Sequence, residues 1–229
     1  MAAESAVARI ERSTADALGT PVMQPGEHIA LRDLADIDLL TSLVGKLLPR
    51  ADPRVSATLW WYSSTSALMS TVASQLLVTG SAIDPRSATV ALDGGVVSAM
   101  TGTEVLHGSH AVRGALELVC SQLITILASI ADGHEASMWA IASDSLANRA
   151  LDAGVELGRI GEATSLAAAL APRAMPTPRY VDVEAGGVGR RFVRRNSCCL
   201  VLEMGQAKCI SCPRQRPEVR ARRLATLLG

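Results

Sequence analysis

Aromatic residues and cysteines are both scarce in this chain: six of its 229 residues are Phe, Tyr or Trp, and five are Cys. With 48% hydrophobic residues, the chain can bury an extensive core without help from disulfides. Its longest apolar run, residues 116–131, is shorter than the roughly 20 residues that a bilayer span requires. Charges at residues 4, 9, 11 and 12 interrupt the segment where a secretory leader would be apolar. We therefore expect a cytosolic protein with no transmembrane segment, in which residues 116–131 form a buried helix.

A net charge is also lacking, because 22 basic residues balance 22 acidic ones. The distribution is uneven. Residues 189–229 contain ten basic and two acidic residues, which leaves 12 basic and 20 acidic residues in the rest of the chain. The C-terminal segment is therefore strongly positive and the remainder is negative.

Four of the five cysteines lie within fifteen residues of one another, at Cys198, Cys199, Cys209 and Cys212. In a reducing cytosol, four close thiols favour metal ligation or redox chemistry over structural disulfides. The remaining cysteine, Cys120, lies in an apolar stretch and is expected to pack as a small hydrophobic residue.

The spacing of the four cysteines distinguishes between metal sites. Zinc ribbons usually contain two Cys-x-x-Cys pairs about 15–20 residues apart, whereas here only Cys209 and Cys212 form such a pair. The doublet Cys198–Cys199 precedes that pair by nine residues, and adjacent side chains point apart, which suits a target with two metal atoms. Four thiolates match the ligand count of a 2Fe-2S cluster. A structural zinc site and a redox dithiol pair remain alternatives.

Neighbouring cations fit an anionic cluster, because positive charge stabilises its reduced form. The basic residues nearest in sequence are Arg190, Arg191, Arg194, Arg195 and Lys208. Gly205 can supply the bend that returns the chain from the doublet to the second pair.

Residues 194–200 (RRNSCCL) and 208–213 (KCISCP) resemble the C-terminal signature of ferric siderophore reductases of the FhuF type. The family usually has ten residues between doublet and pair, and this chain has nine. A looser similarity to helices of the family's reductase domain covers residues 56–62 and 137–146. The resemblance implies that Cys198, Cys199, Cys209 and Cys212 hold a 2Fe-2S cluster.

The resemblance also implies a function: one-electron reduction of iron(III) in a siderophore, which releases iron(II) in the cytosol for iron acquisition. The expected partners are a ferric siderophore and an unidentified electron donor, with peripheral association to a siderophore importer as a further possibility. The arginines at positions 190, 191, 194 and 195 are candidates for substrate docking or for tuning the cluster.

Two alternatives keep the same ligands. A zinc-stapled module could bind nucleic acid through its positive tail, but that tail offers only Phe192 for base stacking and the acidic remainder would repel phosphate. We therefore expect no nucleic-acid partner. A non-catalytic iron-sulfur sensor or binding protein is the second alternative.

Two other groups of residues could take part in binding. His107 and His110 are three residues apart and could be metal ligands, although a helix-entry turn is the favoured interpretation. Trp60, Trp61 and Tyr62 are either a core anchor or a platform for a flat chelate. Three consecutive helical residues cannot all face inward, so at least one of them should lie near the surface.

Helical periodicity dominates the chain and predicts a mainly α (α+β) fold. The predicted domains are residues 1–188, mainly helical with a hairpin near 88–100, and residues 189–229, a basic cluster-binding segment. Helices are expected at 2–18, 30–48, 55–79, 111–132, 135–153, 156–171 and 218–228, and short strands at 88–92, 96–100, 180–183, 191–193 and 200–202.

Overall fold

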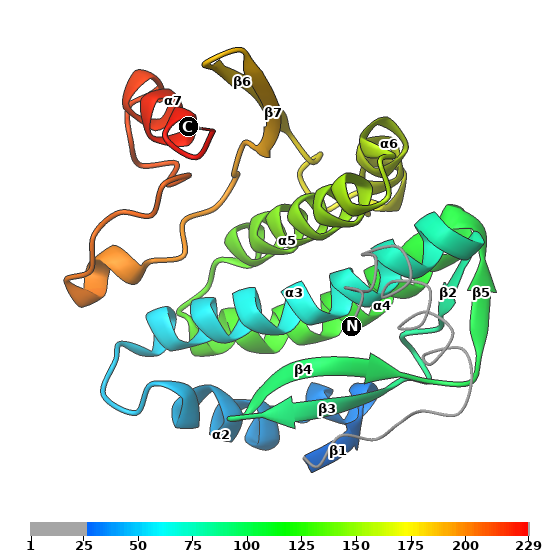
Figure 1. Cartoon of the computed structure of the whole chain (residues 1–229). Coiled ribbons are helices and arrows are strands. Elements are labelled where there is room, and N and C mark those ends of the chain that lie inside the picture. Colours follow the sequence, from blue (N-terminus) through cyan, green and yellow to red (C-terminus); the bar gives the residue numbers. More distant parts are fainter. Residues whose placement is uncertain (1–26, 229) are drawn as a thin grey trace, which may run out of the picture.

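Six α-helices form most of the structure between residues 27 and 228, which is the part of the chain that the computed structural model describes (Figure 1). The predicted mainly α fold is confirmed. The helix predicted at residues 2–18 lies outside the described residues. The helices are α2 (Ile37–Leu47), α3 (Pro53–Thr79), α4 (Gly108–Ile130), α5 (Glu135–Glu156), α6 (Ile160–Leu170) and α7 (Pro217–Ala225), with short 3-10 helices η1 (Leu31–Ala35) and η2 (Val201–Met204).

The longest helix, α3, lies at the centre of the molecule. Its start is fixed by Asp52, whose side chain accepts a hydrogen bond from the Arg54 N–H, and its end by Gly80 in the left-handed conformation. Trp60 and Trp61 are fully buried on it. The Trp60 indole donates to the Gly95 carbonyl and that of Trp61 to the Met138 carbonyl on α5, so α3 is tied to neighbours on two sides.

The predicted hairpin is present as β3 (Thr89–Asp93) and β4 (Val96–Thr101). Gly94 and Gly95 both adopt positive φ, as a tight two-residue turn requires. A strand that the sequence did not predict, β1 (Glu27–Ala30), pairs antiparallel with β3 and gives the order β1-β3-β4. A second small sheet pairs β2 (Ser81–Ile83) with β5 (Val105–His107).

Several predicted helix boundaries are wrong: the helix expected at 156–171 begins only at Ile160, the one expected at 218–228 ends at Ala225, and two others have a clear physical reason. The helix expected from residue 30 begins only after Asp36, whose side chain caps α2 by accepting from the Leu39 N–H. Helix α5 continues through Gly154, where it was predicted to end. A Cβ there would lie 2.5 Å from the Cβ of Ala163 on α6, so this glycine permits close helix packing instead of ending the helix.

Helix α4 is long and apolar enough to cross a membrane by composition. Half of its most apolar window is buried inside the structure, and residues from Val112 to Ala128 pack in the core. One face of α4 therefore lies in the core, as predicted for residues 116–131, although the helix is longer than that apolar run.

The C-terminal part of the chain packs on the side of α5 that faces away from the β3–β4 hairpin (Figure 1). Strands β6 (Tyr180–Ala185) and β7 (Val188–Val193) form a second hairpin, which crosses the predicted domain boundary at residue 188. The strand predicted at residues 200–202 is wrong. Leu200 is left-handed, with φ of 60°, and η2 follows it directly.

Candidate metal centre

Helix α5 positions the cysteine doublet through a single buried carboxylate, that of Asp144. This side chain is fully buried and accepts hydrogen bonds from the Asn196 N–H (2.7 Å), the Ser197 N–H (2.9 Å) and the Ser197 hydroxyl (2.6 Å). A neighbouring bond runs from the Asn196 amide to the Ser143 hydroxyl. The two residues that precede Cys198 are therefore fixed to the helical domain by hydrogen bonds to a buried charge.

The backbone just after the doublet is strained. Leu200 has positive φ, which is unfavourable for a residue with a Cβ. Burial raises the pKa of the Cys198 thiol, and a hydrogen bond from the Leu200 N–H counteracts it by favouring the thiolate. The turn thus directs a backbone donor at a cysteine sulfur, which is the kind of strained geometry found at functional sites.

The second cysteine pair lies in a loop that α7 holds. The Cys212 N–H donates to the Cys209 carbonyl (3.1 Å), which closes a tight turn around the pair. The Gln215 side chain donates to the same carbonyl (2.7 Å), and Arg223 on α7 donates to Gln215 (2.8 Å) and to the Lys208 carbonyl (3.0 Å). Local hydrogen bonds therefore shape the Cys-x-x-Cys loop without any disulfide.

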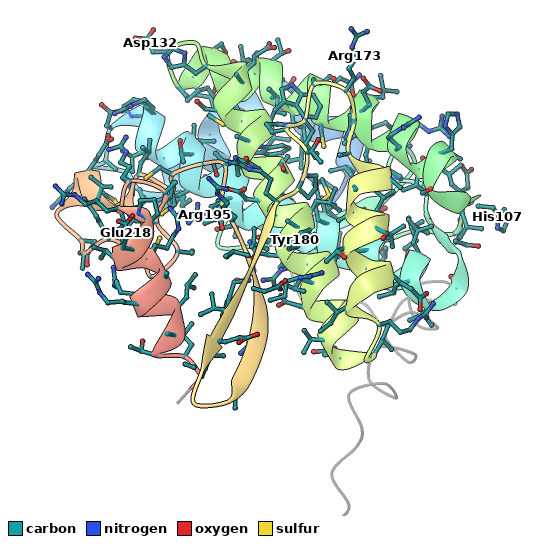
Figure 2. All side chains as sticks on the ribbon, turned by 90° about the horizontal axis from the view of Figure 1, so that it is seen from above. His107, Asp132, Arg173, Tyr180, Arg195 and Glu218 are labelled. Carbon is teal, nitrogen blue, oxygen red and sulfur yellow. The ribbon has the colours of Figure 1, made fainter. Side chains whose placement is uncertain are left out.

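A buried arginine lies between the helical domain and the cysteines. Arg195 is only 8% exposed, its Nη1 donates to Cys209 Sγ (3.5 Å), and its guanidinium stacks over the Tyr62 ring of α3 at 4.8 Å. Its Nε is within ion-pair range of Asp144 at 3.5 Å but makes no hydrogen bond there. Figure 2 shows Arg195 near the middle of the molecule, between α5 and the C-terminal segment.

The charge on Arg195 is secure. Burial alone would lower its pKa, but interactions with Tyr62, Asp144, Cys199 and Cys209 outweigh burial and raise the pKa above its ordinary value. Burial likewise raises the pKa of Cys209, and Arg195 opposes that rise. The arginine therefore stabilises negative charge on the cysteine sulfurs.

All four thiols interact electrostatically. Cys199 and Cys212 each raise the pKa values of both Cys198 and Cys209, so the doublet and the pair lie within electrostatic range of each other. Cys212 is buried and the other three are partly exposed. Among residues 27–228, no group of three or more His, Cys, Asp or Glu side chains is arranged to hold a metal ion, so ligation would need the sulfurs to converge further.

The remaining arginines named from the sequence do not line this region. Arg190 stacks on Phe192, Arg191 binds the Asp182 carboxylate across the β6–β7 hairpin (2.7 Å), and Arg194 is exposed. Of these four arginines, Arg195 is the one placed beside the cysteines.

The other sequence candidates lie elsewhere. His107 ends β5 directly before α4 and contacts the Ser81 hydroxyl at 2.8 Å, while His110 accepts from Arg113. Figure 2 shows His107 on the side of the molecule away from Arg195. Cys120 is buried, and burial raises its pKa to about 12, as expected for a packed thiol.

Of the three consecutive aromatic residues, only Tyr62 reaches the candidate site. Trp60 and Trp61 are core anchors, whereas Tyr62 is partly exposed and lies against Arg195. Asp144 was not singled out from the sequence. The signal that could have found it is an aspartate between apolar positions on the buried face of a helix.

The donor chemistry of these residues, though not their arrangement in this structure, fits a four-thiolate group. Their donors are all sulfur, and the buried Nε and Nη2 of Arg195 have no hydrogen-bond partner among the described residues, so they can still serve an anionic acceptor. Comparison of the chain with protein-family models and with curated proteins found no match for either.

Proposed function

We propose that this protein is an iron-sulfur ferric-chelate reductase, which carries out one-electron reduction of siderophore-bound iron(III) in the cytosol. The observation that carries the proposal is the environment of the two cysteine pairs. The two pairs lie within electrostatic range of each other, beside a buried arginine whose Nε and Nη2 have no hydrogen-bond partner among residues 27–228. The resemblance of residues 194–213 to the FhuF-type signature supports the same function.

Cys198, Cys199, Cys209 and Cys212 would hold a 2Fe-2S cluster, which when bound would supply the single electron that converts iron(III) to iron(II). The protein's own residues perform the remaining tasks. Asp144 fixes the backbone that leads into the doublet, and Gln215 with Arg223 fixes the second loop. Arg195 would stabilise the added negative charge of the reduced state, because its buried guanidinium lies beside Cys209.

Transfer of one electron from the protein to the chelated iron(III) gives iron(II). The chelate then binds the iron more weakly, because hard oxygen ligands bind the trivalent ion more tightly than the divalent one. No proton or group transfer is needed, so the protein requires only a docking surface next to its redox centre. This requirement agrees with the partial exposure of three of the four cysteines.

The alternative of nucleic-acid binding receives less support from the charges. Several basic side chains of the C-terminal segment are engaged within the protein: Arg191 with Asp182, Arg195 with Asp144, Arg214 with Glu203, and Arg223 with Gln215. These contacts reduce the positive surface that is open to phosphates.

The test begins with anaerobically purified protein, analysed by visible and EPR spectroscopy and by iron and sulfide assays. The proposal expects a reddish-brown protein with two iron and two sulfide per chain. Serine in place of any one of the four cysteines should bleach or alter the spectrum, while Cys120→Ser should leave it unchanged. Dithionite-reduced protein, freed of excess reductant and mixed with a ferric siderophore, should reoxidise as iron(II) appears. Colourless protein with one zinc per chain would overturn the proposal.

A further inference from the structure

A cavity of about 350 Å³ adjoins the cysteine doublet. Its walls come from the start of α3, the first turns of α5 and the loop that carries the doublet, with Thr58, Met138 and Ile141 among its less polar lining residues. Of the four cysteines, all within the described part of the chain, Cys198 alone lines it. A molecule in this cavity would therefore lie next to the centre through one particular sulfur.

The charged side chains that line this cavity are both positive. Among the described residues that line it, the charged side chains are Arg54 and Arg214, with the titratable His134 near the start of α5. Both arginines contact the Glu203 carboxylate, Arg214 at 3.2 Å and Arg54 at closer range. The two arginines and one glutamate leave a net charge of +1, and Glu203 does not itself line the cavity.

We infer that this cavity is the docking site for a negatively charged iron(III) chelate, one carboxylate- or catecholate-bearing arm of which enters beside Cys198. The inference rests on the proposed function and adds to it the charge of the substrate and the exit point of the electron. A volume of about 350 Å³ is at the small end of ligand sites, which suits one arm and one face of a chelate and not a whole siderophore.

Glu203 makes the inference testable in both directions. Its carboxylate competes with an incoming anion for the two guanidinium groups, which are well suited to binding carboxylates. Removing the arginines should weaken binding of an anionic chelate, whereas removing Glu203 should strengthen it. A merely structural role for this ion-pair cluster predicts that both changes act in the same direction.

The direct probe is the gallium(III)–EDTA complex, which carries a single negative charge and is not reduced. Calorimetric titration into cluster-loaded, oxidised protein should show binding that the double variant Arg54→Gln with Arg214→Gln weakens by about tenfold, the worth of a charge-assisted hydrogen bond. Glu203→Gln should tighten it by a few-fold. Ala136→Trp, at the exposed mouth of the cavity, should abolish it. A neutral gallium(III) complex, in which three anionic donor groups replace the four of EDTA, should respond to neither charge change.

Arg173→Gln is the matched control, because Arg173 is exposed and lies far from Arg195 (Figure 2). It should bind the gallium complex as the unmodified protein does. Failure of the unmodified protein to bind the complex would overturn the inference. It would also be overturned if the double variant and Ala136→Trp both bound the complex as tightly as the unmodified protein does.

The failure of this inference is distinguishable from failure of the proposed function. If all variants keep the cluster spectrum and are reoxidised by iron(III)–EDTA at one rate, the reductase stands and the docking site is refuted. If gallium binding follows the predicted pattern but reduced protein is not reoxidised by any ferric chelate, the cavity binds anions and the reductase is refuted.

Discussion

Replacement of Asp144 tests whether this residue anchors the cysteine doublet to helix α5. Its carboxylate is fully buried and accepts three hydrogen bonds from Asn196 and Ser197, with Arg195 at 3.5 Å. Removing one partner of a buried charge pair costs about 3–5 kcal/mol, because the other charge is left buried and uncompensated. Asp144→Ala should therefore lower the free energy of unfolding by about that amount.

Asp144→Asn keeps the shape of the side chain and removes its charge. One carboxylate oxygen becomes an NH₂ group that faces N–H and O–H donors, so part of the network loses its acceptor. The expected cost is about 1–3 kcal/mol, the penalty for leaving buried donors unsatisfied. In both variants the iron content should also fall, because the segment that leads into Cys198 is no longer fixed.

The measurement is urea denaturation followed by circular dichroism, with iron and sulfide assayed on the same preparations. Asp152→Ala is the matched control. Asp152 lies on the same helix and pairs with Arg149, but its side chain is 53% exposed, so its loss should cost under about 1 kcal/mol. If Asp144→Ala proves no more destabilising than Asp152→Ala, and keeps its full iron, the assignment of Asp144 as the anchor is refuted.

Three further predictions test packing, charge and the redox centre. Gly154→Ala should destabilise the protein by about 1–3 kcal/mol, because the added methyl group would overpack against α6. Gly114→Ala, whose Cβ would meet no atom within 4 Å, should instead stabilise the protein by roughly 0.5–1 kcal/mol. Thermal or urea denaturation measures both changes. Arg195→Gln should lower the reduction potential in an EPR-monitored titration by some tens of millivolts, about the worth of one charge-assisted hydrogen bond, and an unchanged potential would contradict the stabilising role. Hydrogen bonds from Arg86 lower the pKa of Asp84, so this pair stabilises the fold above the ordinary aspartate pKa and loses that effect as pH falls through the lowered value. Arg86→Gln should therefore move acid unfolding to higher pH, and an unmoved acid transition would contradict that.

Elements with strong local signals could be predicted from the sequence. Helix α3 has a capping aspartate and a proline at its start and Gly80 at its end, and each acts within a few residues. The turn at Gly94 and Gly95 likewise needs only its own residues to adopt positive φ. The error at Gly154 has the opposite origin: its reason for being glycine is Ala163 on another helix, which no local pattern reveals.

The candidate site likewise contains residues that the sequence reveals and residues whose role depends on tertiary packing. The four cysteines are close together in the chain, so the spacing of the residues alone reveals their grouping. Asp144 is 52 residues from Asn196, and the contact between them depends on how the C-terminal segment packs on α5. Arg194 and Arg195 are identical neighbours, yet one is exposed and the other is buried beside Cys209. Sequence spacing could therefore propose the ligands but could not select the residues that tune and position them.

The burial of Arg195 itself argues for an anionic centre. Taking a guanidinium out of water costs several kcal/mol unless its charge and its N–H groups are matched. Asp144 supplies a negative charge 3.5 Å from the Arg195 Nε. Its oxygens, however, already accept hydrogen bonds from Asn196 and Ser197, and the Arg195 Nε makes no hydrogen bond to it. The one acceptor that Arg195 reaches within the described chain is the sulfur of Cys209. A fold that buries a permanent cation against neutral thiols would gain little from it, whereas the same cation against thiolates is stabilising, so the arginine and the cysteines are best understood as one electrostatic unit.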